Sequence, residues 1–316
     1  MNEQLRDRFR GCLLGLAVGD ALGATVEFMS SAEIQQRFGV HRDIIGGGWL
    51  RLKPGEHTDD TDMTLCVARS IVACGRVEPA DIAQRFVAWL ATGPKDVGGT
   101  VRQALDLIAH GVTWREAGQR VWEQRGEHGA GNGSLMRTAP IALFHAWRPD
   151  ELIADSLAVS QITHAHPVAS WSCVALGQAI AAALRSPVGT PTVSLLEQAA
   201  VVAEPRVAEA VREAMLRWPE ELPSKGFVLH TLQLALTAVY RTNSFEDAVV
   251  RVVNRGGDAD TAGAVTGALA GALYGAKAIP ERWLTTLRAR EELEHLADQL
   301  LALALPREIG TSAQSI

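Results

Sequence analysis

Two short acidic segments carry the residue types that bind divalent cations. One reads HTDDTD at positions 57–62 and the other GGDADT at positions 256–261. Together they hold five carboxylates, with threonine hydroxyls beside them. Oxygen ligands of this kind suit Mg²⁺ or Mn²⁺, whereas Zn²⁺ prefers His and Cys. Five carboxylates exceed the need of one Mg²⁺ ion, so the segments predict two metal ions if the fold brings them together.

Helix capping is the alternative explanation for each acidic segment on its own. Both segments precede an apolar helical pattern, and Thr or Asp at a helix start accepts hydrogen bonds from free backbone N–H groups. Capping needs only one or two such side chains, and neither segment contains a Lys. Arg255 is the only nearby cation in the sequence. If the segments converge, repulsion between their carboxylates requires a counter-charge.

Further polar residues interrupt apolar stretches at positions where they could contact a substrate. Glu27 follows a glycine-rich run, Asp96 lies in PKDVGGT, and GNGSLMR begins at Gly131. Each has an ordinary explanation: Glu27 is a solvated side chain, Asp96 is a helix cap, and GNGS is a turn followed by a helix start. The free N–H groups of GNGS suit a phosphate equally well. His164 and His166 form a pair that more often caps or packs than binds metal.

Apolar periodicity indicates the elements that must position these residues. Ile82, Phe86 and Trp89 fall on one helical face, and further faces lie near 152–162, 166–185, 192–217, 227–240, 245–254 and 281–305. Alternation with a period of two, which is typical of strands, is almost absent. We therefore predict an all-α fold. No break is long or biased enough to be a linker, so we expect a single domain over 1–305 and a loose tail over 306–316.

The glycines need an explanation, because the chain has 29 of them and each interior helical glycine costs roughly 0.5–1 kcal/mol relative to Ala. Eight form two stripes with a spacing of four: Gly11, Gly15, Gly19 and Gly23, and Gly263, Gly267, Gly271 and Gly275. Tight core packing explains either stripe alone, because smooth stripes let helix backbones approach closely. The shared form predicts two central helices packed against each other or against neighbours, with their acidic ends in one place.

Composition excludes several classes of partner. The net charge is -6, and no basic stripe with interleaved aromatic residues is present, so we expect no nucleic-acid partner. The apolar windows at 171–184 and 262–276 are shorter than about 18 uninterrupted residues and suit buried helices better than membrane spans. The N-terminus lacks the pattern of a signal peptide, and the four cysteines occur singly. We therefore expect a cytoplasmic protein.

Taken in order, six segments resemble the ADP-ribosylglycohydrolase family. They are GLAVGDALGATVEF at 15–28, GGGWLRLKPGEHTDDTDM at 46–63, DVGGT at 96–100, GNGSLMR at 131–137, THAHP at 163–167 and NRGGDADTAGAVTGALAGALYG at 254–275. The resemblance implies a compact orthogonal helical bundle with a binuclear metal cleft. It implies hydrolysis of the bond between ADP-ribose and a modified protein residue, which is arginine in the nearest relatives. The implied partners are two Mg²⁺ or Mn²⁺ ions and an ADP-ribosylated protein, with ADP-ribose as product.

The same resemblance assigns expected roles residue by residue. The metal ligands are Thr58, Asp59, Asp60, Asp258, Asp260 and Thr261. The catalytic residues are Asp96 and Glu27, and the sequence does not decide which of them is the acid or base. The substrate-binding residues are Gly99, Thr100, Glu127, Gly131, Asn132, Gly133, Ser134, Met136, His166 and Phe227.

Three positions depart from the pattern of the family. Gly99 replaces an Asn, Asp62 replaces a Glu, and Phe227 replaces a Tyr. None of these is a metal ligand, so the departures bear on the preferred substrate more than on activity. Two alternatives therefore stay open. One is a hydrolase of serine-linked or small-molecule ADP-ribose conjugates, and the other is a catalytically silent protein that binds ADP-ribose.

Overall fold

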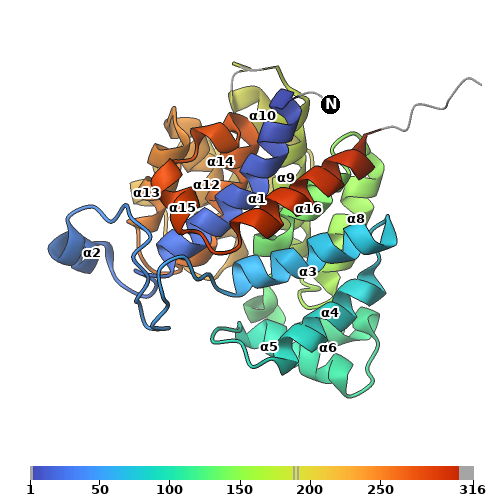
Figure 1. Ribbon diagram of the computed structural model, residues 1–316. Helices are drawn as coiled ribbons and strands as arrows, with labels where there is room; N and C mark the ends of the chain where they lie inside the picture. The colour runs from blue at the N-terminus through green and yellow to red at the C-terminus, as the bar shows by residue number, and fades with distance from the viewer. Residues whose placement is uncertain (1–2, 188, 191, 306–316) are drawn as a thin grey trace, which may run out of the picture.

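The computed structural model describes residues 3–187, 189–190 and 192–305, and the expected tail over 306–316 lies outside them. Within these residues every regular element is a helix, and β pairing is limited to isolated bridges. The all-α prediction is confirmed. The α-helices (Figure 1) are α1 Glu3–Gly23, α2 Ser31–Phe38, α3 Asp59–Cys74, α4 Pro79–Ala91, α5 Gly99–Ala109, α6 Trp114–Arg125, α7 Ala139–Phe144, α8 Pro149–Gln161, α9 Pro167–Arg185, α10 Thr192–Ala199, α11 Pro205–Ala214, α12 Val228–Arg241, α13 Phe245–Val253, α14 Ala259–Tyr274, α15 Glu281–Thr286 and α16 Arg290–Ala304. Short 3-10 helices are η1 Gly126–Gly129, η2 Leu135–Arg137, η3 Pro219–Glu221 and η4 Ala276–Ala278.

Helices α1 and α14 pack against each other along their glycine stripes and run antiparallel. The facing pairs are Gly11 with Gly271, Gly15 with Gly267, Gly19 with Gly263 and Gly23 with Ala259. A Cβ atom on any of these α1 glycines would lie within 2.4 Å of the facing carbonyl oxygen. Only glycine permits this approach, so the predicted packing of two central helices is confirmed. The last member of the second stripe, Gly275, follows α14 and caps it with a φ of +85°.

The antiparallel arrangement brings the end of α1 to the start of α14, and the start of α3 joins them. Asp20 of α1 is fully buried and accepts hydrogen bonds from the backbone N–H of Thr58 at 3.0 Å and of Thr61 at 3.1 Å. The Thr61 hydroxyl also donates to Asp20, at 2.5 Å. One aspartate therefore anchors the first turn of α3 to the glycine helix.

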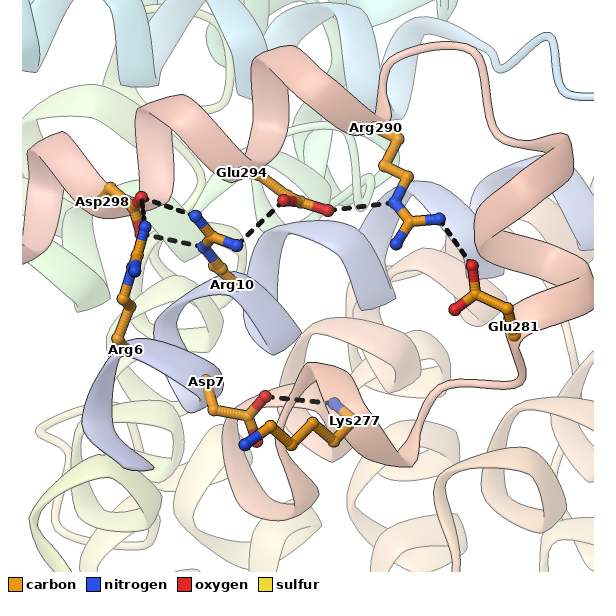
Figure 2. Close-up of polar contacts among 8 residues, drawn as sticks. All are labelled: Arg6, Asp7, Arg10, Lys277, Glu281, Arg290, Glu294 and Asp298. Atoms are coloured by element: carbon orange, nitrogen blue, oxygen red, sulfur yellow. Dashed lines mark hydrogen bonds and ion pairs between the residues drawn. The ribbon is translucent and has the colours of Figure 1, made fainter. Parts of the chain in front are cut away.

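The other half of α1 is held by an ion-pair network with α16, which crosses it (Figures 1 and 2). Asp298 accepts hydrogen bonds from Arg6 and from Arg10 at 2.6–2.9 Å. Glu294 bridges Arg10 and Arg290, as Figure 2 shows. The bonds from the two arginines hold the pKa of Asp298 well below its usual range. The glycine helix is thus fixed at both ends.

A contiguous hydrophobic core runs from Phe9 to Ala304 within the described residues. Helix α9 is long and apolar enough to cross a membrane by length and composition, but 83% of its apolar window is buried inside the protein. Its apolar side chains therefore belong to the core, as expected for the window at 171–184. The single-domain organisation over 1–305 stays a prediction.

Two predicted helical stretches are divided in the structure. The stretch at 192–217 becomes α10 and α11, because Pro205 occupies the first turn of α11 and has no N–H to continue a preceding helix. The stretch at 281–305 becomes α15 and α16, because Leu287 adopts an extended conformation after α15. Neither division alters the elements around the acidic segments.

Candidate active site

The joined helix ends open onto a cleft of about 530 Å³. Its walls come from the segment after α1, the starts of α3, α5 and α14, the GNGS loop and the residues before α12. The predicted site residues that line it are Glu27, Asp59, Asp96, Gly99, Thr100, Gly131, Asn132, Gly133, Met136, Asp258, Asp260 and Thr261. Segments separated by most of the chain thus meet in one place.

The two acidic segments contact each other beside this cleft, which Thr261 lines but Thr58 and Asp60 do not. The Thr261 hydroxyl donates to Asp60 Oδ2 at 3.4 Å, and the Thr58 hydroxyl donates to the same oxygen at 3.2 Å. The other oxygen of Asp60 and Oδ1 of Asp260 are buried and have no hydrogen-bond partner. An unpaired buried carboxylate oxygen is costly, and a hard divalent cation supplies the missing partner. The residues present therefore fit the predicted metal site.

Capping does not explain the acidic side chains. Thr58 does cap α3, since its hydroxyl accepts a bond from the N–H of Asp60 at 3.5 Å. Asp258 stands at the cap position of α14 but makes no side-chain capping bond. The start of α5 is capped by Gly98 rather than by Asp96. Helix capping therefore does not account for Asp96 or Asp258.

Both predicted catalytic carboxylates stand beside a predicted ligand. Glu27, Asp96 and Asp260 each place one carboxylate oxygen within 4.8 Å of the others, a spacing that could also hold a metal ion. This group contains only one of the six residues expected to bind metal. Glu27 is further held by Trp49, whose indole N–H donates to Glu27 Oε2 at 2.6 Å.

Burial raises the pKa of the carboxyl groups in the cleft. For Asp59, Asp60 and Asp260, burial and then the neighbouring carboxylates raise the pKa well above its usual range. Burial is also the main reason that the pKa of Glu27 rises to about 8 and that of Asp96 is raised. Since these groups cannot all ionise together without positive charge, the cluster binds either protons or cations.

The GNGS loop is held in place by a buried arginine. Arg137 is fully buried and donates to the carbonyl of Gly133 at 2.9 Å and to the Thr163 hydroxyl oxygen at 2.7 Å. The Thr163 hydroxyl lies 2.8 Å from Nδ1 of His164. Because the hydroxyl oxygen already accepts a bond from Arg137, the hydroxyl donates its proton to Nδ1, and the imidazole proton is on Nε2. Burial lowers the pKa of His164 to about 3, so the ring is neutral.

The loop also contacts the side of the cleft that carries the predicted metal ligands. The side-chain amide of Asn132 donates to Asp258 at 2.5 Å and to the Thr231 hydroxyl at 2.8 Å. The backbone N–H of Asn132 donates to the carbonyl of Gly226 at 3.1 Å. A loop suited to a phosphate is therefore joined to a predicted metal ligand.

Four predicted substrate residues do not line the cleft. The Ser134 hydroxyl is buried against Ser160, and the ring of Phe227 packs against His230. His166 caps α9, and its Nε2 lies 3.5 Å from the exposed carboxylate of Glu127. Glu127 also pairs with Arg206 at 3.0 Å.

The predicted site residues omit several that line or support the cleft, among them Phe28, Lys225, Asp20, His164 and Trp49. Asp20 anchors α3, and its signal was a charged residue inside an apolar glycine helix. His164 lines the cleft, whereas the prediction chose its neighbour His166. Trp49 holds Glu27 from a loop whose path the sequence does not reveal.

Comparison with known proteins agrees with this geometry. A family model described as ADP-ribosylglycohydrolase matches residues 1–309. The chain is 40% identical to the ADP-ribosyl-[dinitrogen reductase] glycohydrolase of Rhodospirillum rubrum, covering 95% of this chain and 97% of that protein. It is 34% identical to the ADP-ribosylarginine hydrolase Tri1 of Serratia proteamaculans, covering 94% of this chain and 80% of that protein.

A solved structure shows the same fold. It is that of an ADP-ribosylglycohydrolase-related protein complex, and it superposes with a TM-score of 0.82 at 39% identity, covering 96% of this chain and all of that one. The family match, the relatives and the shared fold all extend over nearly the whole sequence. The chain therefore belongs to the ADP-ribosylglycohydrolase family.

Proposed function

We propose that this protein is a metal-dependent hydrolase that removes ADP-ribose from the arginine guanidino group of a modified protein. The observation that carries the proposal is the buried carboxylate cluster between α3 and α14, in which Asp60 and Asp260 each keep an unpaired oxygen. The names of the Rhodospirillum and Serratia relatives support the choice of substrate. Dinitrogen reductase is the first candidate for the target protein.

Thr58, Asp59, Asp60, Asp258, Asp260 and Thr261 are the residues proposed to hold two Mg²⁺ or Mn²⁺ ions. Divalent cations bound there would supply positive charge and a polarised water. The supporting observation is that Thr261 and Asp60, from the two segments, are already in hydrogen-bond contact at 3.4 Å.

Glu27 and Asp96 are proposed to transfer the proton. Hydrolysis breaks the bond between the ribose carbon and the guanidino nitrogen, adds the hydroxyl of water to the carbon and returns its proton to the nitrogen. A carboxyl group beside the ribose performs this transfer, and both residues stand next to Asp260. The surrounding carboxylates also stabilise the positive charge that develops on the ribose.

The GNGS loop is proposed to bind the diphosphate of ADP-ribose. Gly131 and Gly133 line the cleft just before η2, and glycines let a phosphate approach the backbone closely. His164 adds a neutral N–H donor to the same wall. Gly99 and Thr100 also line the cleft, at the start of α5.

The test is the release of free ADP-ribose from an ADP-ribosylarginine protein and from an ADP-ribosylserine peptide, with Mg²⁺ or Mn²⁺ and with a chelator. We expect metal-dependent release from the arginine-linked substrate. Glu27→Gln and Asp96→Asn should each reduce turnover by roughly 100-fold or more. Release from serine alone contradicts the proposed linkage, and binding of ADP-ribose without release identifies a silent binding protein.

A further inference from the structure

Two aromatic side chains stand exposed at the rim of the cleft, next to Glu27. The side chains of Phe28 and Trp49 are exposed by 67% and 51%, and their ring centroids lie 5.4 Å apart. Phe28 lines the cleft, and Trp49 donates its indole N–H to Glu27. Exposed aromatic patches of this kind mark binding surfaces more often than chance, because water solvates them poorly.

The Trp49 ring is held at the tip of a short hairpin. Gly47 and Leu52 exchange backbone hydrogen bonds at 2.7 and 2.9 Å. The Thr25 hydroxyl donates to the carbonyl of Gly46 at 3.0 Å and ties the hairpin to the segment after α1. The indole is therefore positioned without being buried, so it does not owe its place to the hydrophobic core.

The Phe28 ring is held outward by a strained backbone. Its φ is +64°, in the left-handed region that bulky residues rarely adopt. The strain is sustained by neighbours on both sides, since Phe28 N–H donates to the carbonyl of Gly257 at 2.7 Å and Gly257 N–H donates to that of Met29 at 2.8 Å. Strain of this kind persists where it presents a side chain for function.

The chemistry of the rim fits a planar cation. Aromatic faces attract a guanidinium through their quadrupoles. The carboxylate of Glu27 contacts Trp49, and Asp96 lies near Glu27 in the same cleft. ADP-ribose carries two negative phosphate charges, which suit the GNGS loop rather than a wall of carboxylates. The aromatic rim therefore fits the group on the other side of the scissile bond.

We propose that Phe28 and Trp49 form the binding surface for the guanidinium of the target arginine and so set the preference for arginine-linked ADP-ribose. This inference rests on the proposed function. The rings stack on the guanidinium, while Trp49 keeps Glu27 beside the bond to be broken. A serine-linked substrate has no cation to place there.

The first test is binding of the unmodified product peptide to the metal-loaded protein. A peptide with one arginine is compared with the same peptide carrying citrulline, which has the shape of arginine without its charge. We expect the arginine peptide to bind roughly 2- to 30-fold more tightly, as cation–π contacts predict. Phe28→Leu should abolish the difference, whereas the control Trp218→Leu, at an exposed aromatic residue away from the cleft, should retain it.

The second test separates this inference from the proposed function. In Phe28→Leu the KM for an ADP-ribosylarginine peptide should rise by roughly 2- to 30-fold, with the inhibition constant of free ADP-ribose unchanged. Weaker ADP-ribose inhibition, or equal binding of the arginine and citrulline peptides, overturns the inference and leaves the hydrolase intact. Preference for the arginine peptide in a protein that releases no ADP-ribose refutes the proposed function alone.

Discussion

At the scale of single residues, the unpaired oxygens distinguish this cluster from ordinary helix capping. Caps are satisfied by the backbone, as Thr58 is, whereas Asp60 and Asp260 each keep a buried oxygen without any donor. Neighbouring carboxylates make the same two groups harder to ionise. Without bound cations, the carboxylates of this cluster destabilise the fold, and with bound cations they stabilise it. Each of these acidic residues therefore has two opposite effects on the free energy of unfolding.

The variant Asp60→Asn should separate those two effects. It removes a buried ionisable group from a carboxylate cluster, so the metal-free variant should unfold at the same temperature as the wild type or higher. Stabilisation by Mg²⁺ or Mn²⁺ should fall by about 1.4 kcal/mol or more, equivalent to a tenfold loss of affinity. Thermal unfolding with and without metal measures both. Asp106→Asn, on the exposed face of α5, is the control, and an equal response in the two variants contradicts the assignment.

The stability of the metal-free protein should depend on pH in a defined direction. The pKa of Glu27 rises from 4.5 to about 8 on folding, so the folded state favours the protonated carboxyl. The stability linked to this group is complete below pH 4.5 and is lost as the pH rises through about 8. Denaturant unfolding from pH 5 to 8 should show this decline, and Glu27→Gln should reduce it. A metal-free protein that gains stability over this range would exclude the carboxylate cluster as the dominant titrating feature.

At the scale of elements, the glycine stripes determine where the acidic segments meet. The register that places Gly19 against Gly263 also places the end of α1 at the start of α14. Residues 11–23 of α1 and 259–272 of α14 are all buried, so the pair cannot shift without disturbing the core. The close approach therefore supports both the fold and the site.

Gly19→Ala should damage stability and metal binding together. The new Cβ would lie 2.0 Å from the carbonyl oxygen of Gly263, which is backbone and cannot turn away. We expect a loss of about 3 kcal/mol or more, at the upper end of overpacking effects, with weaker metal affinity. The matched control is Gly177→Ala in α9, whose Cβ would meet a flexible Leu152 side chain at 3.1 Å. Denaturant unfolding and metal titration measure both, and similar behaviour of the two variants would disprove the packing role.

The ion pairs between α1 and α16 should matter for stability rather than for metal affinity. Asp298 receives bonds from Arg6 and Arg10 (Figure 2), and Asp298→Asn is expected to cost about 1 kcal/mol. Since these bonds depress the pKa of Asp298, its contribution is present above its unfolded pKa of about 3.9 and is lost as the pH falls below it. Glu3→Gln, in an exposed pair with Lys277, is the control. A change in metal affinity in Asp298→Asn would show that these ion pairs affect the metal site as well as stability, and would contradict the prediction.

At the scale of the whole molecule, features with a regular spacing could be predicted and irregular ones could not. The period of four in the glycines predicted two closely packed central helices, but their pairing with each other rather than with neighbours comes from the structure. The position of Trp49 depends on a hairpin with left-handed glycines, whose path is fixed by contacts distant in sequence. The choice between His164 and His166 depends on where α9 begins, a matter of one or two residues. Asp20 could be identified as unusual, but not as the anchor of α3.

We expect two metal ions to bind where the starts of α3 and α14 meet. Anomalous X-ray scattering from crystals grown with Mn²⁺ locates such ions directly. We expect two ions in the cleft, coordinated by Asp59 or Asp60 from one segment and by Asp258 or Asp260 from the other. Manganese bound elsewhere, or no manganese between these segments in an active enzyme, would contradict this expectation.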